Sequence, residues 1–278
     1  MVQPGTFYVV ALSIGNPADL SPRAIETLRT ADVVLAEDTR SARKLLLAHG
    51  IERRTQSCFD GNEPARAAEV GQWLRAGQSV ALVSEAGTPS VSDPGYRVVR
   101  AAIEAGARVV PVPGPSAVLA ALVASGLPTD HFFFAGFPPR KAGARRALFT
   151  QLAPLGATLV FYESPHRTGA TLGELAALLG PTRPACLARE LTKTHEELVR
   201  GTLGELAERY LGERPLGEIT LVVGAATAPS LDDDEGLRAR ARAWLGQGLS
   251  VRDAADRLAA ESPRGRRELY QLVLSLRK

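Results

Sequence analysis

Aromatic residues are scarce in this sequence, at 5% of 278 residues, and there is a single methionine. Alanine, leucine and valine must therefore form most of any hydrophobic core. Apolar residues make up 45%, an ordinary content for a soluble globular protein, and no apolar run is long enough to span a membrane. The length allows one large domain or two domains of medium size.

Cysteine is also rare, with only Cys58 and Cys186 present. Two cysteines without metal-ligand spacing indicate neither a disulfide framework nor a zinc site, so we expect buried thiols in a reducing cytoplasm. The four histidines are scattered, at His49, His131, His166 and His195. No basic, apolar leader opens the sequence. We therefore expect a cytoplasmic protein that uses neither a metal nor a membrane.

Most of the chain carries no surplus of positive charge. The net charge is +3, but residues 236–278 hold ten Lys or Arg and four Asp or Glu, a local +6, so the other 235 residues sum to −3. A basic module attached to a slightly acidic body indicates contact with a polyanion. A solvated helical face without a partner would account for the same charges.

A stretch rich in glycine and proline, residues 84–96, is the part around which the rest of the chain is organised. Before it, residues 79–83 form an apolar run that predicts a buried strand. After it, residues 96–105 predict a helix with apolar residues, among them Ile103, on one face. Because ligands of open α/β sheets bind beyond the carboxyl ends of strands, this stretch is a candidate binding loop.

The composition of this loop favours one kind of ligand. Gly87 can take a positive φ and let the backbone approach a ligand closely, and the prolines stiffen the loop. It holds four small hydroxyls and two carboxylates, Glu85 and Asp93, but no lysine that would hold a phosphate. The loop therefore suits a ligand with a cationic or hydroxyl-bearing part. The alternative is a tight loop that only faces solvent.

Strands and helices alternate along the first half of the chain. We predict strands at residues 6–12, 32–35, 55–59, 79–83 and 108–112, with helices between them. This alternation predicts parallel βαβ units. Further strands are predicted at residues 131–137, 158–164, 185–191 and 217–223. The expected fold class is α/β, with one α/β domain at residues 1–113 and a second at residues 114–228.

Residues 229–278 are expected to form a small helical module. Residues 232–235 are acidic and have the composition of a linker, and Ser250 is placed to cap the first of two helices. The second helix begins with three arginines, in an arrangement like a helix-turn-helix: Arg264, Arg266 and Arg267. Alternatively, the two helices only cover an apolar face of the second domain with their leucines.

Polar residues that follow the strands are candidates for substrate contacts. Glu37, Asp38 and Arg40 follow the second strand. The two acids would also complement the positive end of the next helix, which Thr39 can cap, but Arg40 gains nothing from that dipole. The other candidates are Asn16 after the first strand, the basic patch Arg140, Lys141, Arg145 and Arg146, and Arg167 and Lys193 after later strands.

The sequence of residues 84–96, Ser-Glu-Ala-Gly-Thr-Pro-Ser-Val-Ser-Asp-Pro-Gly-Tyr, closely resembles the signature of the bacterial 16S ribosomal RNA (cytidine-2'-O)-methyltransferases. These enzymes belong to the tetrapyrrole methylase superfamily. The resemblance extends over roughly residues 5–226 and includes the motifs at residues 161–167, 188–193 and 217–219. Two departures are Ser13, where the family has proline, and the missing histidine of a His-x-x-Asn-Glu pattern that ends at Glu63.

The resemblance implies two α/β domains with a cleft for S-adenosylmethionine between them. It also implies a homodimer that methylates a cytidine ribose in the decoding centre of the small ribosomal subunit. The residues at positions similar to the superfamily's cofactor-contacting loops are Glu85, Ala86, Gly87, Ser116, Ala117, Tyr162 and Glu163.

The implied reaction is attack of a ribose 2'-hydroxyl on an electrophilic methyl group, and a base that takes the hydroxyl proton would help it. The candidates are His166, Glu85, Glu163 and Asp93, and the sequence does not choose among them. His166 has the alternative role of a hydrogen-bonding residue at a helix start.

Two other functions remain open from the sequence. A small-molecule methylase acting on a tetrapyrrole would be common in the superfamily, but such a substrate needs neither the basic module nor the patch at residues 140–146. A ribosome-assembly factor that binds RNA and has lost its cofactor would not need the intact motifs.

Overall fold

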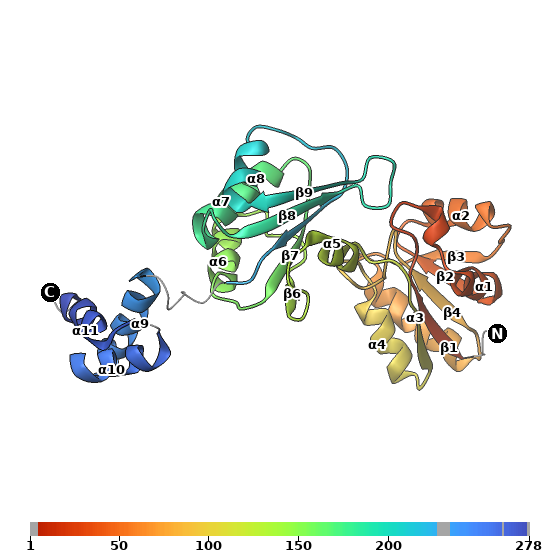
Figure 1. Cartoon of the computed structure of the whole chain (residues 1–278). Coiled ribbons are helices and arrows are strands. Elements are labelled where there is room, and N and C mark those ends of the chain that lie inside the picture. Colours follow the sequence, from red (N-terminus) through yellow and green to blue (C-terminus); the bar gives the residue numbers. More distant parts are fainter. Residues whose placement is uncertain (1–4, 227–233, 263, 277–278) are drawn as a thin grey trace. The chain divides into compact units, whose positions relative to one another are not determined.

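The computed structural model describes residues 5–226, 234–262 and 264–276. The chain divides into two compact units, one formed by Met1–Ala153 with Ala157–Gly224 and the other by Pro154–Gly156 with Ala225–Lys278. We call them the body and the tail (Figure 1). Among the described residues, no helix combines the length and the apolar character of a membrane span.

The N-terminal part of the body is a parallel sheet with the strand order β3-β2-β4-β1-β5. Its strands are β1 (Thr6–Val10), β2 (Val33–Ala36), β3 (Arg54–Ser57), β4 (Val80–Val83) and β5 (Arg108–Val112). The helices between them are α1 (Pro22–Thr30), α2 (Thr39–Ala48), α3 (Glu63–Arg75) and α4 (Tyr96–Glu104), and a 3-10 turn, Pro17–Asp19, precedes α1. The predicted parallel βαβ units are confirmed.

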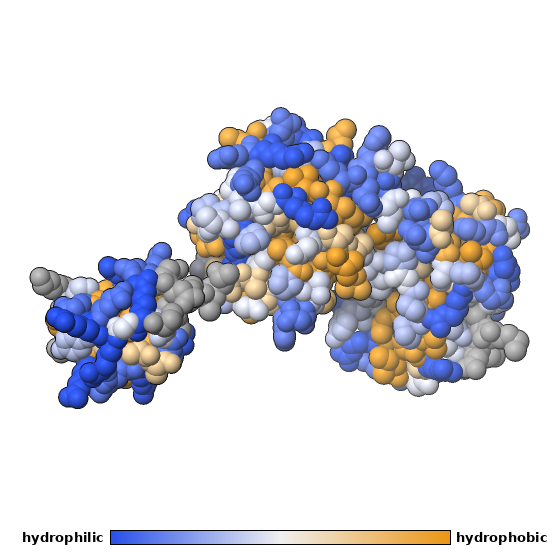
Figure 2. Space-filling view, viewed as in Figure 1, coloured by the Kyte–Doolittle hydropathy of each residue, from blue (hydrophilic) through white to orange (hydrophobic). Residues whose placement is uncertain are grey.

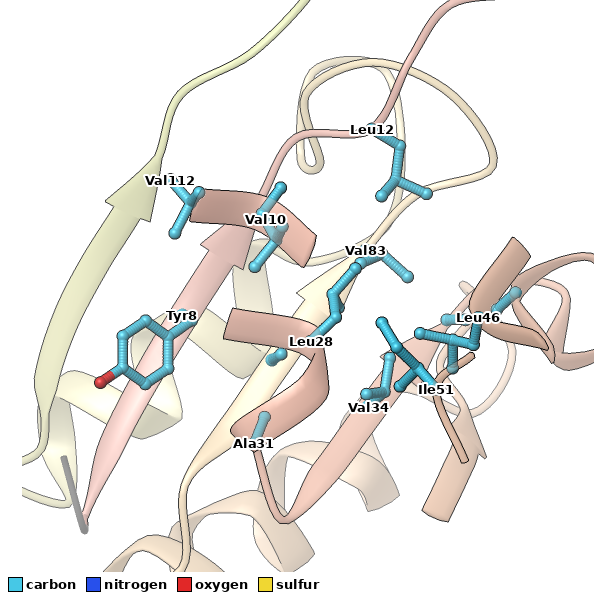
Figure 3. Packing of buried hydrophobic residues seen from close by; sticks show 14 of the residues in the cluster. Tyr8, Val10, Leu12, Leu28, Ala31, Val34, Leu46, Ile51, Val83 and Val112 are labelled. Atoms are coloured by element: carbon cyan, nitrogen blue, oxygen red, sulfur yellow. The ribbon is translucent and has the colours of Figure 1, made fainter. Parts of the chain in front are cut away.

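Side chains alternate along these strands and divide the core into two layers. Tyr8 and Val10 of β1 pack with Leu28 of α1 and Leu46 of α2 on one face of the sheet (Figure 3). Phe7 belongs to the other layer, with side chains of α3 and α4. The pair α1 and α2 therefore covers one face of the sheet, and the pair α3 and α4 covers the opposite face.

Two local predictions in this sheet are wrong. Asp38, and not Thr39, caps α2, because the Asp38 carboxylate accepts the backbone N–H of Arg40 at 2.7 Å. Ile103 is 60% exposed, and Val98 and Ala102 form the buried face of α4. Residues four apart share a helix face, whereas the fifth residue after Val98 turns away from it.

The second sheet of the body is mixed, with the order β6-β7-β10-β8-β9, and only β6 and β7 pair in parallel. Its strands are β6 (Phe132–Phe134), β7 (Thr158–Glu163), β8 (Pro184–Arg189), β9 (Glu197–Thr202) and β10 (Ile219–Val223). One face packs against α5 (Ala117–Ser125) and the other against α6 (Ala142–Leu152), α7 (Thr168–Leu179) and α8 (Leu203–Arg209). The sequence analysis missed β9, whose residues are mostly half-buried and polar.

The tail contains three described helices, α9 (Asp234–Gly246), α10 (Val251–Glu261) and α11 (Arg266–Ser275), rather than the two that were predicted. Asp234 and Glu235 begin α9 instead of forming a linker, while Asp232, Asp233 and the predicted boundary at 228 lie outside the described residues. Ser250 caps α10 as predicted. Of the four leucines that might have covered the second domain, Leu258, Leu269 and Leu272 belong to a core of the tail's own, while Leu249 is half-buried outside that core.

Candidate active site

A cavity of about 410 Å³ lies in the body, beside the loop that follows β4. This volume is in the range of small-molecule sites. Its other walls come from the start of α5, the end of β7 and the residues that lead into β10. The lining residues are Ile14, residues 85–88 and 91–93, Ser116, Ala117, Phe137, residues 162–165, Leu191 and residues 217–220.

The structure brings the predicted cofactor residues together. All seven line the cavity: Glu85, Ala86, Gly87, Ser116, Ala117, Tyr162 and Glu163. Three of the four base candidates, Glu85, Glu163 and Asp93, line it, whereas His166 is exposed and is not among the lining residues. None of the residues predicted to contact substrate lines the cavity.

The loop after β4 is held against the segment after β1 by backbone hydrogen bonds. The Leu12 N–H donates to the Gly87 carbonyl at 2.8 Å, and the Gly87 N–H donates to the Ser13 carbonyl at 3.3 Å. Gly87 has a φ of +71°, and a Cβ there would lie 3.2 Å from Cγ2 of Ile14. Glycine therefore satisfies both the conformation and the space at this point of the wall.

The far end of the same loop is fixed by a buried carboxylate that the sequence analysis matched to the family but gave no role. Oε1 of Glu63 accepts the N–H groups of Gly95 at 3.0 Å and Arg97 at 2.7 Å. It thus caps α4 from another helix, in place of a side chain at the cap position. Between the two anchors, Ser90 and Ser92 adopt positive φ angles of 68° and 65°. Strain of this kind persists where the surrounding structure determines the conformation.

Carboxylates gather near the cavity, and burial and neighbouring charges raise the pKa of two of them, Asp93 and Glu37. Burial, together with the neighbouring charges of Glu37 and Glu85, raises the pKa of Asp93 to about 6, and a Ser84 hydrogen bond only partly offsets this. The pKa of Glu37 is raised by burial and by the charges of Glu85 and Asp60. Such a group of acids favours a cationic ligand. Within the described residues, no three potential ligands among His, Cys, Asp and Glu are arranged to hold a metal ion.

Tyr162 contributes a neutral side chain to the same cavity. Burial and then the charge of Asp93 raise the pKa of its hydroxyl to about 12, although this oxygen accepts the N–H of Val118. Its ring packs edge-on against Phe134 at 4.9 Å between centroids. Tyr162 is therefore an uncharged part of the cavity wall at neutral pH.

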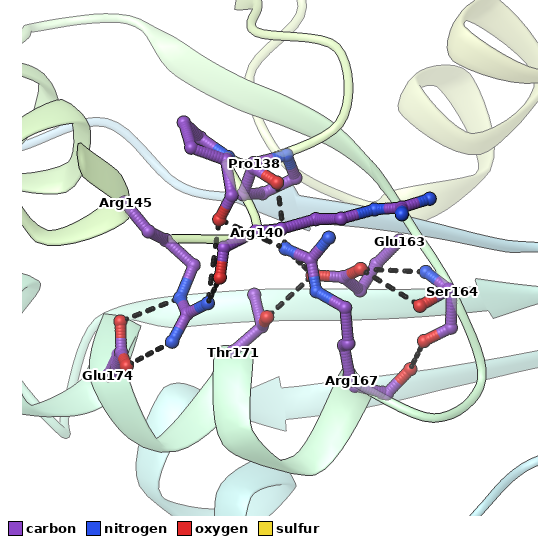
Figure 4. A network of polar contacts seen from close by, with 10 residues as sticks. Pro138, Arg140, Arg145, Glu163, Ser164, Arg167, Thr171 and Glu174 are labelled. Carbon is purple, nitrogen blue, oxygen red and sulfur yellow. Dashed lines mark hydrogen bonds and ion pairs between the residues drawn. The ribbon is translucent and has the colours of Figure 1, made fainter. Parts of the chain in front are cut away.

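Glu163 lines the cavity, but its carboxylate is already engaged (Figure 4). Oε1 accepts the Ser164 N–H at 2.7 Å, Oε2 accepts the Thr171 hydroxyl at 2.5 Å, and Nη2 of Arg167 lies 3.4 Å from Oε2. The Glu163 side chain is fully buried. This carboxylate is therefore not free to take a proton from a substrate.

Part of the predicted basic patch is structural. Arg145 forms a two-pronged ion pair with Glu174 and donates to the carbonyls of Pro139 and Arg140 (Figure 4). Arg167 donates to the Pro138 carbonyl at 2.7 Å. These two guanidinium groups brace the segment before α6. Three members of the patch lie exposed at the surface: Arg140, Lys141 and Arg146.

Asn16 and Lys193 join the loop after β1 to the loop after β8. The Asn16 N–H donates to the Thr192 hydroxyl at 3.1 Å, and Nζ of Lys193 pairs with Glu190 at 2.8 Å and Glu218 at 3.1 Å. The Lys193 stem lies so close to Gly15 that a Cβ there would overlap it, at 2.5 Å. Both predicted substrate residues therefore shape the protein beside the cavity.

The sequence analysis gave no site role to several lining residues. Glu218 and Gly217 belong to a motif that was noticed only as part of the resemblance, and Phe137 was placed in a strand that in fact ends at Phe134. The motif was the available signal, because it begins the strand predicted at residues 217–223. Ile14 and Leu191 carry no chemistry and could be found only from the fold.

A parallel sheet, a mixed sheet and a cavity walled by loops from both define an α/β protein with a small-molecule site. Residues 6–207 match the model of the family described as Tetrapyrrole (Corrin/Porphyrin) Methylases. The chain belongs to this family, as the loop sequence indicated.

Relatives with known names cover the chain from end to end. It is 45% identical to "Ribosomal RNA small subunit methyltransferase I" of Synechocystis sp., over 98% of each chain. It is 48% identical to the protein of the same name from Mycobacterium tuberculosis, over 99% of this chain and 96% of the relative. Among solved structures, a uroporphyrin-III-C-methyltransferase from Thermus thermophilus is similar, with a TM-score of 0.57 and 27% identity over 79% of this chain and 94% of that chain.

The raised pKa of Asp93 gives a direct test of the site's electrostatics. We expect the Asp93 carboxyl to titrate near pH 6 in a carbon-detected NMR titration, and the pKa to fall in Glu37→Gln because a like charge is removed. The exposed Glu104→Gln serves as a control that leaves the titration in place. A midpoint near the ordinary value of 3.8 in the unmodified protein would contradict this description.

Proposed function

We propose that this protein transfers a methyl group from S-adenosylmethionine to the ribose 2'-hydroxyl of a cytidine in the decoding centre of 16S ribosomal RNA, within the small ribosomal subunit. The protein is a methyltransferase that uses S-adenosylmethionine and acts on ribosomal RNA. The main observation in favour of a ribose hydroxyl as the methyl acceptor is Asp93. This half-buried carboxylate of raised pKa faces the cavity that all seven predicted cofactor residues line.

The cavity fits the proposed cofactor. The methyl donor supplies a methyl group that is already electrophilic because it sits on a positively charged sulfur. Backbone at Gly87 and the small residues Ser116 and Ala117 leave room beside the start of α5. The carboxylates of Glu85 and Glu218 suit the cationic and hydroxyl-bearing parts of such a molecule.

Asp93 is the base that we assign to the reaction. Accepting the proton of a ribose hydroxyl requires a carboxylate that is ionised at neutral pH but binds a proton readily, and a pKa near 6 meets both conditions. Glu163 is engaged in hydrogen bonds, and His166 lies outside the cavity wall. Holding the hydroxyl in line with the methyl group is the body's other contribution, and orientation of this kind lowers barriers by up to roughly 7–11 kcal/mol.

The tail is an argument for a polymeric substrate. Its helices α9, α10 and α11 lie beyond the family match, which ends at residue 207, and residues 236–278 hold ten Lys or Arg against four Asp or Glu. We propose that the tail contacts RNA through exposed arginines such as Arg267. Arg264 and Arg266 are paired with Asp234 and Asp256, so less of their charge is available. The exposed Arg140, Lys141, Arg146 and Arg40 are proposed as further substrate contacts.

We also propose a cytoplasmic homodimer. α5 is apolar on all sides, and Leu119 and Val123 on it are 51% and 72% exposed. Figure 2 shows hydrophobic surface where α5 lies. Phe132 and Phe133 of the edge strand β6 are also exposed. A helix without a polar face is typical of one that is covered on every side, and a second copy of the chain would complete that cover.

The RNA target is tested by mass mapping of 16S RNA from a strain that lacks the gene. We expect the loss of one ribose methyl in the decoding centre, restored by the wild-type gene. Asp93→Asn should lower methyl transfer by about 10²- to 10⁴-fold, as expected for a lost general base, with S-adenosylmethionine affinity within a few-fold. In the wild type, kcat/KM should rise with pH through about 6, because the ionised Asp93 is the active form. An unchanged set of ribose methyls would refute the proposed substrate.

The dimer is tested by Val123→Asp. A carboxylate on the exposed side of α5 would have to be buried without a partner, so sedimentation should show a monomer. Leu211→Asp, which changes a residue that is 80% exposed outside α5, should stay dimeric. A Val123→Asp protein that remains dimeric would exclude α5 from the interface.

A further inference from the structure

The outward face of α2 carries a row of cations that the sequence analysis noticed only at its first member. Arg40, Arg43, Lys44 and Leu47 are spaced by three and four residues, so they share one helix face, and all four are exposed. The opposite side of α2 is buried in the core through residues such as Leu46. The row is therefore the solvent-facing side of a helix that is firmly packed.

The row continues past the end of α2. A small pocket of about 240 Å³ lies there, lined by Arg43, Leu46, Leu47, Ile51, Glu52 and Arg53. Nε of Arg53 donates to the Arg29 carbonyl at 2.5 Å, which holds this guanidinium at the pocket. We call Arg40, Arg43, Lys44 and Arg53 the α2 row.

Most of the α2 row is not neutralised by neighbouring acids. In the part of the chain that the structure describes, Arg43, Lys44 and Arg53 form no ion pair, and Arg40 is paired only with Asp38, at 3.6 Å. Arg53 helps to lower the pKa of Asp32, but hydrogen bonds from Ser79 are the main cause and occupy that carboxylate. By contrast, Arg145 of α6 and Lys193 in the loop after β8 are each paired with a carboxylate.

The row also starts beside the cavity. α2 follows β2, whose last residue, Ala36, pairs with Val83 at the end of β4, and the loop that follows β4 lines the cavity. Burial and then the charge of Glu85, a lining residue, raise the pKa of Glu37, which lies just before α2. From there the helix runs back along the sheet for about 15 Å, the length of its ten residues at 1.5 Å each. A chain that enters the cavity at one nucleotide can therefore lay its neighbouring phosphates along the row.

We propose that the α2 row binds the sugar-phosphate backbone of the RNA strand next to the target nucleotide. This inference rests on the proposed function, since a small molecule held in the cavity would not reach along α2. Guanidinium and ammonium groups without acidic partners are the groups that contact phosphates, and such contacts fix the register of a nucleic acid without reading its bases. The α2 row is thus a positioning surface for the substrate.

The experiment compares two double variants of the full chain. Arg43→Glu with Lys44→Glu reverses two charges of the row, and Arg75→Glu with Arg100→Glu reverses two exposed charges of α3 and α4 on the opposite face of the sheet. Both doubles change the net charge equally. Binding to purified small ribosomal subunits is measured over a series of salt concentrations, and S-adenosylmethionine affinity is measured by calorimetry.

We expect the α2 double to weaken subunit binding at least tenfold at low salt. The slope of log affinity against log salt should become shallower by about 1.4 to 1.8, for two lost phosphate contacts. The control double should stay within about twofold of the wild type, and both should bind S-adenosylmethionine normally. Arg43→Ala with Lys44→Ala removes the charges without adding repulsion and should flatten the slope in the same way.

An α2 double that methylates and binds subunits with the wild-type slope would overturn this inference while leaving the proposed function intact. An equal loss of subunit affinity in both double variants would also overturn this inference, because such a loss would reflect the net charge alone. If the wild type itself neither binds nor methylates small-subunit RNA, the proposed function fails, and this inference fails with it.

Discussion

The backbone pairing at Gly87 is the contact on which the rest of the site depends. Its carbonyl and N–H bond to Leu12 and Ser13, and these two hydrogen bonds press the loop after β4 against the segment after β1. The positive φ of Gly87 disfavours any other residue, and a Cβ there would crowd the Ile14 side chain at 3.2 Å. Glu63 fixes the other end of the loop. With both ends held, Asp93 between them has a defined position beside the cavity.

The surroundings of the cavity differ between its acids and give them different roles. Asp93 keeps a high pKa because it is half-buried near Glu37 and Glu85, whereas Glu163 is satisfied by hydrogen bonds and serves as a structural wall. Hydrogen bonds hold Glu163 in place as part of the wall, and Asp93 is the carboxylate that we propose as the base. In our proposal, a single strand of RNA contacts the acids of the cavity near the start of α2. It then contacts the cations of the α2 row along the rest of that helix.

The sequence could predict the parallel sheet because it depends on local patterns, whereas the seven cavity residues came from the resemblance to the superfamily's cofactor-contacting loops. Apolar runs, glycine and proline mark the strands and the loops at their carboxyl ends. Contacts between distant segments left no such signal. Two residues predicted to contact substrate form ion pairs in the structure, Lys193 with Glu218 and Arg145 with Glu174, and nothing in the local sequence indicated these pairs. Net charge alone favoured the tail as the RNA-binding surface, although acids pair with Arg264 and Arg266 there. The α2 row does not stand out in the net charge, because it lies in a part of the chain that is slightly acidic overall.

The central claim is that backbone at Gly87 forms a wall of the S-adenosylmethionine site, and calorimetry on Gly87→Val tests it most directly. Gly106→Val is the matched control. Gly106 has a similar φ of +74°, but a Cβ there would meet no atom of the described residues within 4 Å, so valine imposes the same backbone strain away from the cavity. We predict that Gly87→Val loses at least 100-fold in cofactor affinity with its circular dichroism spectrum retained, while Gly106→Val binds as the wild type does. Unchanged affinity in Gly87→Val would contradict the account.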